Sequence, residues 1–139
     1  MSLHVLDTDT LTLFQEGDAS VCSHASAHPP SDLAITVLSV EEQLSGWYSA
    51  LRRAKSVEKL AWAYRRLAEN IRFFSRLQII AFNEPAILRY QQLTKLKLNV
   101  RKMDLRIAAV VLEIDATLVT CNVRDFKQVP TLRWVDWSK

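Results

Sequence analysis

The stretch Leu3-His-Val-Leu-Asp-Thr-Asp-Thr10 opens the chain with a short apolar run that ends in two acidic residues. Such a run predicts a buried strand over residues 3–6 that leads directly into a helix. Similar runs predict strands over 33–37, 78–82 and 117–120, with an edge strand over 132–135. Helices are predicted over 19–28, 39–51, 56–76, 85–98 and 102–115. This alternation predicts an α/β fold, a three-layer α/β/α sandwich with a central, mainly parallel sheet of four to five strands.

Capping residues set the expected starts of three helices. Asp18 suits the N-cap of the helix over 19–28, and Ser56 suits the N-cap of the helix over 56–76. Ser39 with Glu42 three residues later forms a capping-box pattern. The helix over 56–76 has the strongest periodicity, which predicts a buried apolar stripe. That stripe comprises Leu60, Tyr64, Leu67, Ile71 and Phe74.

Length and composition are those of one compact domain, which we expect to span residues 1–139. The chain has 139 residues and is 49% hydrophobic. No apolar run approaches the ~18 residues of a membrane span, and the N-terminus lacks the features of a signal peptide. Cys22 and Cys121 have no metal-ligand spacing, which indicates reduced thiols. We therefore expect a cytoplasmic protein that does not bind membranes.

Charge is divided unevenly along the chain. Residues 1–50 contain seven acids and no Lys or Arg, a formal charge of −7. Residues 51–139 contain all 18 basic residues and eight acids, a charge of +10 that brings the total to +3. Acidic pockets attract cations and basic surfaces attract phosphates. The division favours a metal-dependent enzyme acting on nucleic acid, although charged solvated helices are the ordinary explanation.

Acidic residues follow the predicted strands, at the edge where open α/β sheets bind their ligands. Asp7 and Asp9 follow the first strand, Glu42 follows the second, and Asp125 follows the fourth. Asp104 lies in the first turn of its helix on an otherwise apolar face, where an acid is costly unless paired. Several such carboxylates would repel one another unless a divalent ion lay among them. Oxygen ligands favour Mg²⁺ or Mn²⁺ over Zn²⁺.

Each acid also has an ordinary explanation. Asp7 and Asp9 suit turns, and Glu42 could close a capping box. Asp104 could stabilise the N-terminus of its helix. Asn122 and Asp125 have the spacing of a capping pair. For any single acid, the ordinary explanation is preferable. Taken together, acids at corresponding positions after several strands favour a metal site.

These motifs resemble those of the PIN-domain ribonucleases and, within them, the VapC-type toxins of bacterial toxin–antitoxin pairs. Residues 6–10 resemble the opening LDTN or LDTS signature, and residues 39–46 resemble the segment in which the metal-site Glu precedes a Gly by four. That register selects Glu42 over Glu41. Residues 104–109 resemble the DxxIAA helix start, with Arg106 where most members are apolar. Residues 116–130 resemble ATLVTxNxRDFxxVPGL, with Thr131 in place of the following Gly, and residues 132–137 resemble the closing strand.

The resemblance implies a PIN-like fold and an Mg²⁺- or Mn²⁺-dependent endoribonuclease. RNA phosphodiesters would be cleaved by metal-activated water, with transfer RNA or ribosomal RNA as expected substrates. A cognate VapB-type antitoxin would neutralise the enzyme, and homodimers are common. The implied catalytic and metal-binding residues are Asp7, Glu42, Asp104 and Asp125. Three further residues are expected to orient these four acids without binding the metal ion themselves: Asp9, Thr120 and Asn122.

Two surfaces are candidates for macromolecular contacts. A basic track for the RNA backbone is predicted on the two helices before the third strand. It comprises Arg52, Arg53, Lys55, Arg65 and Arg66, although exposed helices are often basic for solubility alone. Trp62 and Phe73 lie off the apolar stripe of their helix. They either belong to the core or line a groove for a helix of the antitoxin.

Two other functions compete with the nuclease. Asp7-Thr-Asp9 after an apolar strand also resembles the DxD motif of haloacid-dehalogenase-type phosphatases, in which the first Asp is the nucleophile. The residue two positions after the second Asp is Leu11, where that family has Thr or Val. The second rival is a non-catalytic Mg²⁺-binding regulatory or interaction domain. Such a domain would need an acceptor Asp after the third strand, where Phe82-Asn-Glu84 stands.

Overall fold

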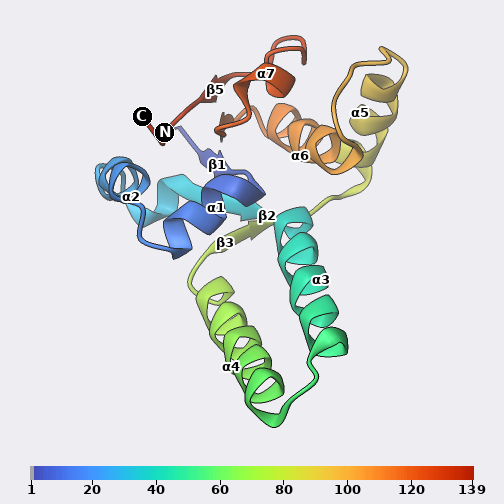
Figure 1. Cartoon of the computed structure of the whole chain (residues 1–139). Helices are drawn as coiled ribbons and strands as arrows, with labels where there is room; N and C mark the ends of the chain where they lie inside the picture. The colour runs from blue at the N-terminus through green and yellow to red at the C-terminus, as the bar shows by residue number, and fades with distance from the viewer. Residues whose placement is uncertain (1) are drawn as a thin grey trace.

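The computed structural model describes residues 2–139 and confirms the predicted α/β fold (Figure 1). Its five strands form one sheet in the order β3-β2-β1-β4-β5, and each neighbouring pair is parallel. The strands are β1 (His4–Leu6), β2 (Leu33–Thr36), β3 (Gln78–Ile80), β4 (Thr117–Val119) and β5 (Trp134–Val135). Because the strands are parallel, their carboxyl ends meet at one edge of the sheet.

Helices connect the strands and cover the sheet. They are α1 (Thr8–Gln15), α2 (Ala19–Ser26), α3 (Val37–Arg53), α4 (Val57–Phe74), α5 (Glu84–Thr94), α6 (Lys102–Glu113) and α7 (Val123–Phe126). A 3₁₀ turn, Pro30–Asp32, precedes β2. Within residues 2–139, no helix combines the length and the apolar character needed to span a membrane.

Two apolar cores lie on opposite faces of the sheet. Successive strand residues point to opposite faces, so Val5 and Leu118 pack with α5 and α6 in one core. Leu6 and Val119 pack in the other core with α1, α2 and the end of α4. The sheet is therefore the middle layer of the predicted α/β/α sandwich. This burial holds the carboxyl ends of β1 and β4 rigidly beside each other.

The predicted start of α3 was wrong. The helix begins at Val37, and Thr36 is its N-cap, whose hydroxyl accepts a hydrogen bond from the backbone N–H of Ser39 at 3.3 Å. Thr36 ends β2 in an extended conformation, so it supplies the cap before Ser39 is reached. Glu42 consequently lies in the second turn and does not belong to a capping box with Ser39. The predicted caps Asp18 and Ser56 are confirmed.

The helices α3 and α4 form an arm that extends away from the sheet (Figure 1). The predicted burial of the α4 stripe was wrong for most of its length, because Leu60, Tyr64 and Ile71 are exposed. Only the carboxyl end of α4 reaches the core, where Phe74 is buried. The arm is longer than the sheet can cover, so the periodicity of α4 marks an apolar face that the described part of the chain leaves open.

Candidate active site

Asp7 lies at the junction between β1 and α1, where it is the N-cap of the helix. Its Oδ1 accepts the backbone N–H of Thr10 at 2.9 Å, and its Oδ2 accepts the hydroxyl of Thr120 at 2.6 Å. The residue is only 3% exposed. The strand end and the two hydrogen bonds therefore fix the position of this carboxylate. Asp7 caps α1, whereas the ordinary explanation for this residue was a turn.

Burial raises the pKa of Asp7 to about 6, although the hydrogen bonds from Thr120 and Thr10 oppose the increase. The negative charge of Asp9 adds a smaller increase. Among the described residues, Asp7 forms no ion pair that would offset the cost of burying its charge. A carboxylate held in this way is suited to binding a cation.

A chain of hydrogen bonds joins Asp7 to Asp125. The Thr120 hydroxyl donates to Asp7 and accepts the backbone N–H of Asn122 at 2.9 Å. The side-chain amide of Asn122 then donates to Oδ2 of Asp125 at 3.0 Å. Asn122 is the N-cap of α7 but makes no side-chain capping hydrogen bond. Thr120 and Asn122 thus contact the two carboxylates directly. Their role in orienting metal ligands, which the resemblance implies, stays a prediction.

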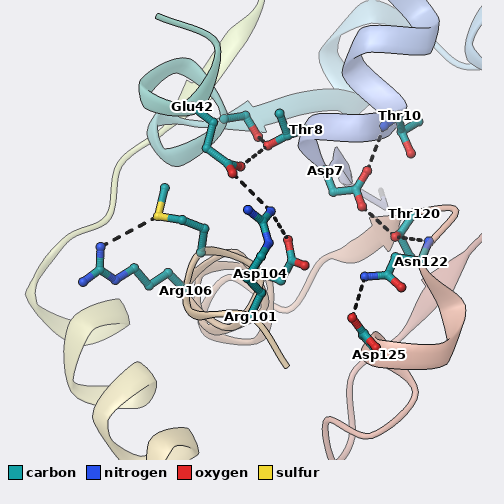
Figure 2. A network of polar contacts seen from close by, with 12 residues as sticks. Asp7, Thr8, Thr10, Glu42, Arg101, Asp104, Arg106, Thr120, Asn122 and Asp125 are labelled. Carbon is teal, nitrogen blue, oxygen red and sulfur yellow. Dashed lines mark hydrogen bonds and ion pairs between the residues drawn. The ribbon is translucent and has the colours of Figure 1, made fainter. Parts of the chain in front are cut away.

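A second polar group surrounds Glu42 and Asp104 (Figure 2). The Thr8 hydroxyl donates to Oε1 of Glu42 at 2.6 Å and lies 2.9 Å from the Ser39 hydroxyl. Nη2 of Arg101 lies 3.1 Å from Oε2 of Glu42 and 3.2 Å from Oδ1 of Asp104. One guanidinium therefore joins an acid of α3 to an acid of α6.

Burial raises the pKa of Asp104, and the hydrogen bond and positive charge of Arg101 partly oppose this effect. The negative charges of Glu42 and Asp9 raise it further. Asp9 itself is exposed in the first turn of α1. It makes no side-chain hydrogen bond within residues 2–139, so it influences the two buried acids through its charge alone.

The four predicted carboxylates lie in two hydrogen-bonded groups that meet at the adjacent residues Asp7 and Thr8 (Figure 2). Within residues 2–139, no three His, Cys, Asp or Glu side chains stand together closely enough to hold a metal ion. The guanidinium of Arg101 separates two of the acids, and Asn122 holds a third. Joint metal binding by all four acids stays a prediction.

The donor chemistry of this edge nevertheless fits a divalent cation. The acidic groups offer carboxylate oxygens, which suit Mg²⁺ or Mn²⁺. Glu42 and Asp104 already share a positive group, whereas Asp7 is buried and has no such partner in the described part of the chain. The type of these ligands fits a divalent cation, and its binding at this edge stays a prediction. Asp7, Glu42, Asp104 and Asp125 are the residues that would hold it.

The predicted basic track lies away from these acids. Arg52 and Arg53 end α3, and Lys55 follows in the turn at the tip of the arm. Arg53 is about 16 Å along the helix from Glu42, at a rise of ~1.5 Å per residue. Arg65 and Arg66 continue the exposed basic surface on α4. Their contact with RNA stays a prediction, and an RNA strand would have to extend from the sheet edge along the arm to reach them.

Sequence reasoning missed three side chains at the sheet edge. Thr8 and Arg101 bind Glu42 directly, and Nε of Arg124 lies 3.5 Å from Oδ1 of Asp125. The sequence contains one usable signal, since Arg124 immediately precedes Asp125. Nothing local indicates that Arg101 reaches α3, because Glu42 is distant in sequence.

Comparisons with known proteins give one group of relatives over nearly the full length of the chain and another over about half of it. Ribonuclease VapC1 of Haemophilus influenzae (strain R2866) is 26% identical over 143 residues, which cover 99% of this chain and 99% of that protein. Ribonuclease VapC2 of Rickettsia felis is 39% identical over 71 residues, which cover 48% of this chain and 53% of that protein. No protein-family model matches the chain.

A solved structure shares the fold. The crystal structure of VapBC2 from Rickettsia felis, bound to a DNA fragment from its promoter, contains a chain that matches with a TM-score of 0.74 and 25% identity. The match covers 97% of this chain and 98% of that one. Together, the sequence and structure comparisons confirm the resemblance to the VapC-type proteins inferred from the motifs.

Proposed function

From the premise that this chain resembles the VapC-type PIN-domain proteins in sequence and fold, we propose that it is the ribonuclease toxin of a VapBC-type toxin–antitoxin pair. Its activity is the Mg²⁺- or Mn²⁺-dependent cleavage of RNA phosphodiesters. The observation that carries this proposal is Asp7, a buried carboxylate at the carboxyl end of β1 that has no ion-pair partner within residues 2–139. Two further acids, Glu42 and Asp104, share a cationic group at the same edge of the sheet.

The residues of the site have separate tasks in this reaction. A bound divalent ion would stabilise charge on the phosphate and lower the pKa of an attacking water. Asp7, Glu42, Asp104 and Asp125 would hold that ion. Thr120 orients Asp7 by donating its hydroxyl proton at 2.6 Å, and Thr8 orients Glu42 in the same way. The reaction requires neither a histidine nor a ribose hydroxyl as nucleophile.

The test is a cleavage assay on a fluorescently labelled RNA. The purified chain should cut it in the presence of Mg²⁺ or Mn²⁺ and lose the activity in EDTA. Asp7→Asn and Asp104→Asn should each reduce the rate by at least about a hundredfold, since removing one strong electrostatic contribution costs ~2.7–4 kcal/mol. Glu58→Gln, a change of an exposed acid on α4, is the control and should retain the wild-type rate.

Three results would contradict the proposed reaction. RNA cleavage by Asp7→Asn and Asp104→Asn at the wild-type rate would remove these acids from the chemistry. Hydrolysis of a generic phosphate ester, with no RNA cleavage, would favour the haloacid-dehalogenase-type phosphatase. If the protein bound Mg²⁺ without cleaving either substrate, the regulatory domain would be favoured.

A groove between α1, α3 and α4 is the proposed docking site for a VapB-type antitoxin. It encloses about 910 Å³, and both Trp62 and Phe73 line it. Trp47 meets Trp62 edge to face at 5.7 Å, and the guanidinium of Arg66 lies over both rings. Asn70 also lines the groove, and its buried Oδ1, which has no hydrogen-bond partner within residues 2–139, could accept a hydrogen bond from an incoming helix.

The partner is best tested in the cell. Expression of the chain alone should slow bacterial growth, and co-expression of the neighbouring antitoxin gene should restore it. Trp47→Glu should prevent this rescue, because Trp47 lines the groove and contributes no group to the acidic site. Normal growth despite confirmed soluble expression would contradict the toxin assignment. Light scattering of the purified chain tests the further expectation that it forms a homodimer.

A further inference from the structure

Arg101 is shared by two acids from different parts of the chain. It is the N-cap residue of α6, and its Nη2 lies 3.1 Å from Oε2 of Glu42 and 3.2 Å from Oδ1 of Asp104. A single nitrogen therefore holds together two carboxylates that would otherwise repel each other (Figure 2). Glu42 and Asp104 are also two of the residues that would hold a divalent cation at this edge.

The exposure of the three side chains differs sharply. The Arg101 side chain is 60% exposed, whereas those of Glu42 and Asp104 are 17% and 12% exposed. The acids are fixed in the protein, while the arginine reaches them from solvent. Its side chain makes no capping hydrogen bond to α6, so it can leave without removing a cap from the helix.

We propose that Arg101 is an internal competitor for the metal site, whose guanidinium occupies the space between Glu42 and Asp104 until a divalent cation displaces it. The inference rests on the metal-dependent function proposed above and specifies how the site is kept closed. A guanidinium and a divalent ion repel each other and need the same carboxylate oxygens. Metal entry therefore requires Arg101 to rotate outward.

Competition between Arg101 and the metal ion should lower the apparent metal affinity by a measurable amount. A ligand that binds only the open form has its apparent affinity reduced by the fraction of molecules that are open. Because Arg101 is largely exposed, its ion pairs are weakened by solvent, and we expect a modest closing effect. Removing the side chain should therefore tighten metal binding by roughly three- to tenfold.

The experiment is calorimetric titration of the full chain with Mn²⁺, without RNA. Arg101→Ala should bind Mn²⁺ roughly three- to tenfold more tightly than the wild type. Arg101→Gln keeps most of the side-chain bulk and should also bind Mn²⁺ more tightly than the wild type. It tests the inference if the alanine variant does not fold. Arg133→Ala is the matched control, because Arg133 is 57% exposed and pairs with Asp115 at 3.0 Å. It loses the same charge and should bind Mn²⁺ as the wild type does.

Thermal unfolding provides a second readout. In EDTA, Arg101→Ala should unfold at a lower temperature than the wild type, because Glu42 and Asp104 then face each other without a cation. Saturating Mn²⁺ should raise its unfolding temperature by more than it raises that of the wild type.

The outcomes separate this inference from the proposed function. Equal or weaker Mn²⁺ binding by both Arg101 variants would overturn the competitor role while leaving the metal site in place. Equal tightening in Arg133→Ala would also overturn it, since net charge would then account for the effect. Absence of Mn²⁺ binding in the wild type and both Arg101 variants would overturn the proposed metal site, and this inference with it.

Discussion

Replacing Asp7 by Asn should change how the stability of the protein depends on pH. Asp7 has a folded-state pKa of about 6, raised first of all by burial, against an ordinary value of 3.8. The folded protein therefore binds this proton more tightly than the unfolded chain does. The resulting stabilisation is full below pH 3.8 and is lost as the pH rises through about 6.

The magnitude follows from these two pKa values. Their difference corresponds to about 3 kcal/mol in total, of which about 2 kcal/mol falls between pH 8 and pH 4.5. Asn does not titrate, so Asp7→Asn should lack this change. Relative to the wild type, the variant should gain about 2 kcal/mol on going from pH 4.5 to pH 8. In a chain of this size, that corresponds to roughly 4–8 °C in unfolding temperature.

The assay is urea unfolding of both proteins in EDTA at pH 4.5 and pH 8. Differences in hydrogen bonding between Asp and Asn do not depend on pH, and they cancel when the two pH values are compared. Glu58→Gln supplies the control for an exposed acid and should follow the wild type. A stability difference between Asp7→Asn and wild type that is the same at both pH values would refute the reasoning.

Three further predictions concern other parts of the structure. Thr120→Val should destabilise the protein by about 1–3 kcal/mol and raise the pKa of Asp7, since it removes a buried donor to that carboxylate; urea unfolding and an NMR titration measure the two effects. Trp137→Ala should cost about 3–5 kcal/mol, because the indole is buried and stacks on the rings of His4 and His28, whereas Trp137→Phe should cost less in the same unfolding assay. His4→Gln should reduce the stability that the protein loses between pH 7 and pH 5, because burial and then the charge of His28 lower the pKa of His4. A stability difference between variant and wild type that is the same at pH 7 and pH 5 would contradict this.

The sheet was largely predictable because each strand is a short apolar run ended by polar residues. The observed β1, β2 and β4 begin or end within one residue of their expected limits. The prediction failed at the start of α3, where two residues could serve as the N-cap. It also failed on α4, where the sequence does not show whether another element covers the apolar face. Thr36 displaced Ser39 as the cap of α3, since both residue types can accept the N-terminal hydrogen bond. The stripe on α4 has the periodicity of a core helix, yet no periodicity can say whether another element covers it.

For the candidate site, the sequence alone determined the sheet edge and the acids that follow its strands. Parallel strands carry their following residues to a common edge, so Asp7 and Asp125 could be placed near each other from order alone. Only the tertiary structure decided how the charges are partnered. Arg101 forms an ion pair with Glu42 across a large separation in sequence, and the Thr120 hydroxyl donates a hydrogen bond to Asp7 across a larger one. Burial and side-chain rotation set these contacts, and both depend on the packed molecule as a whole.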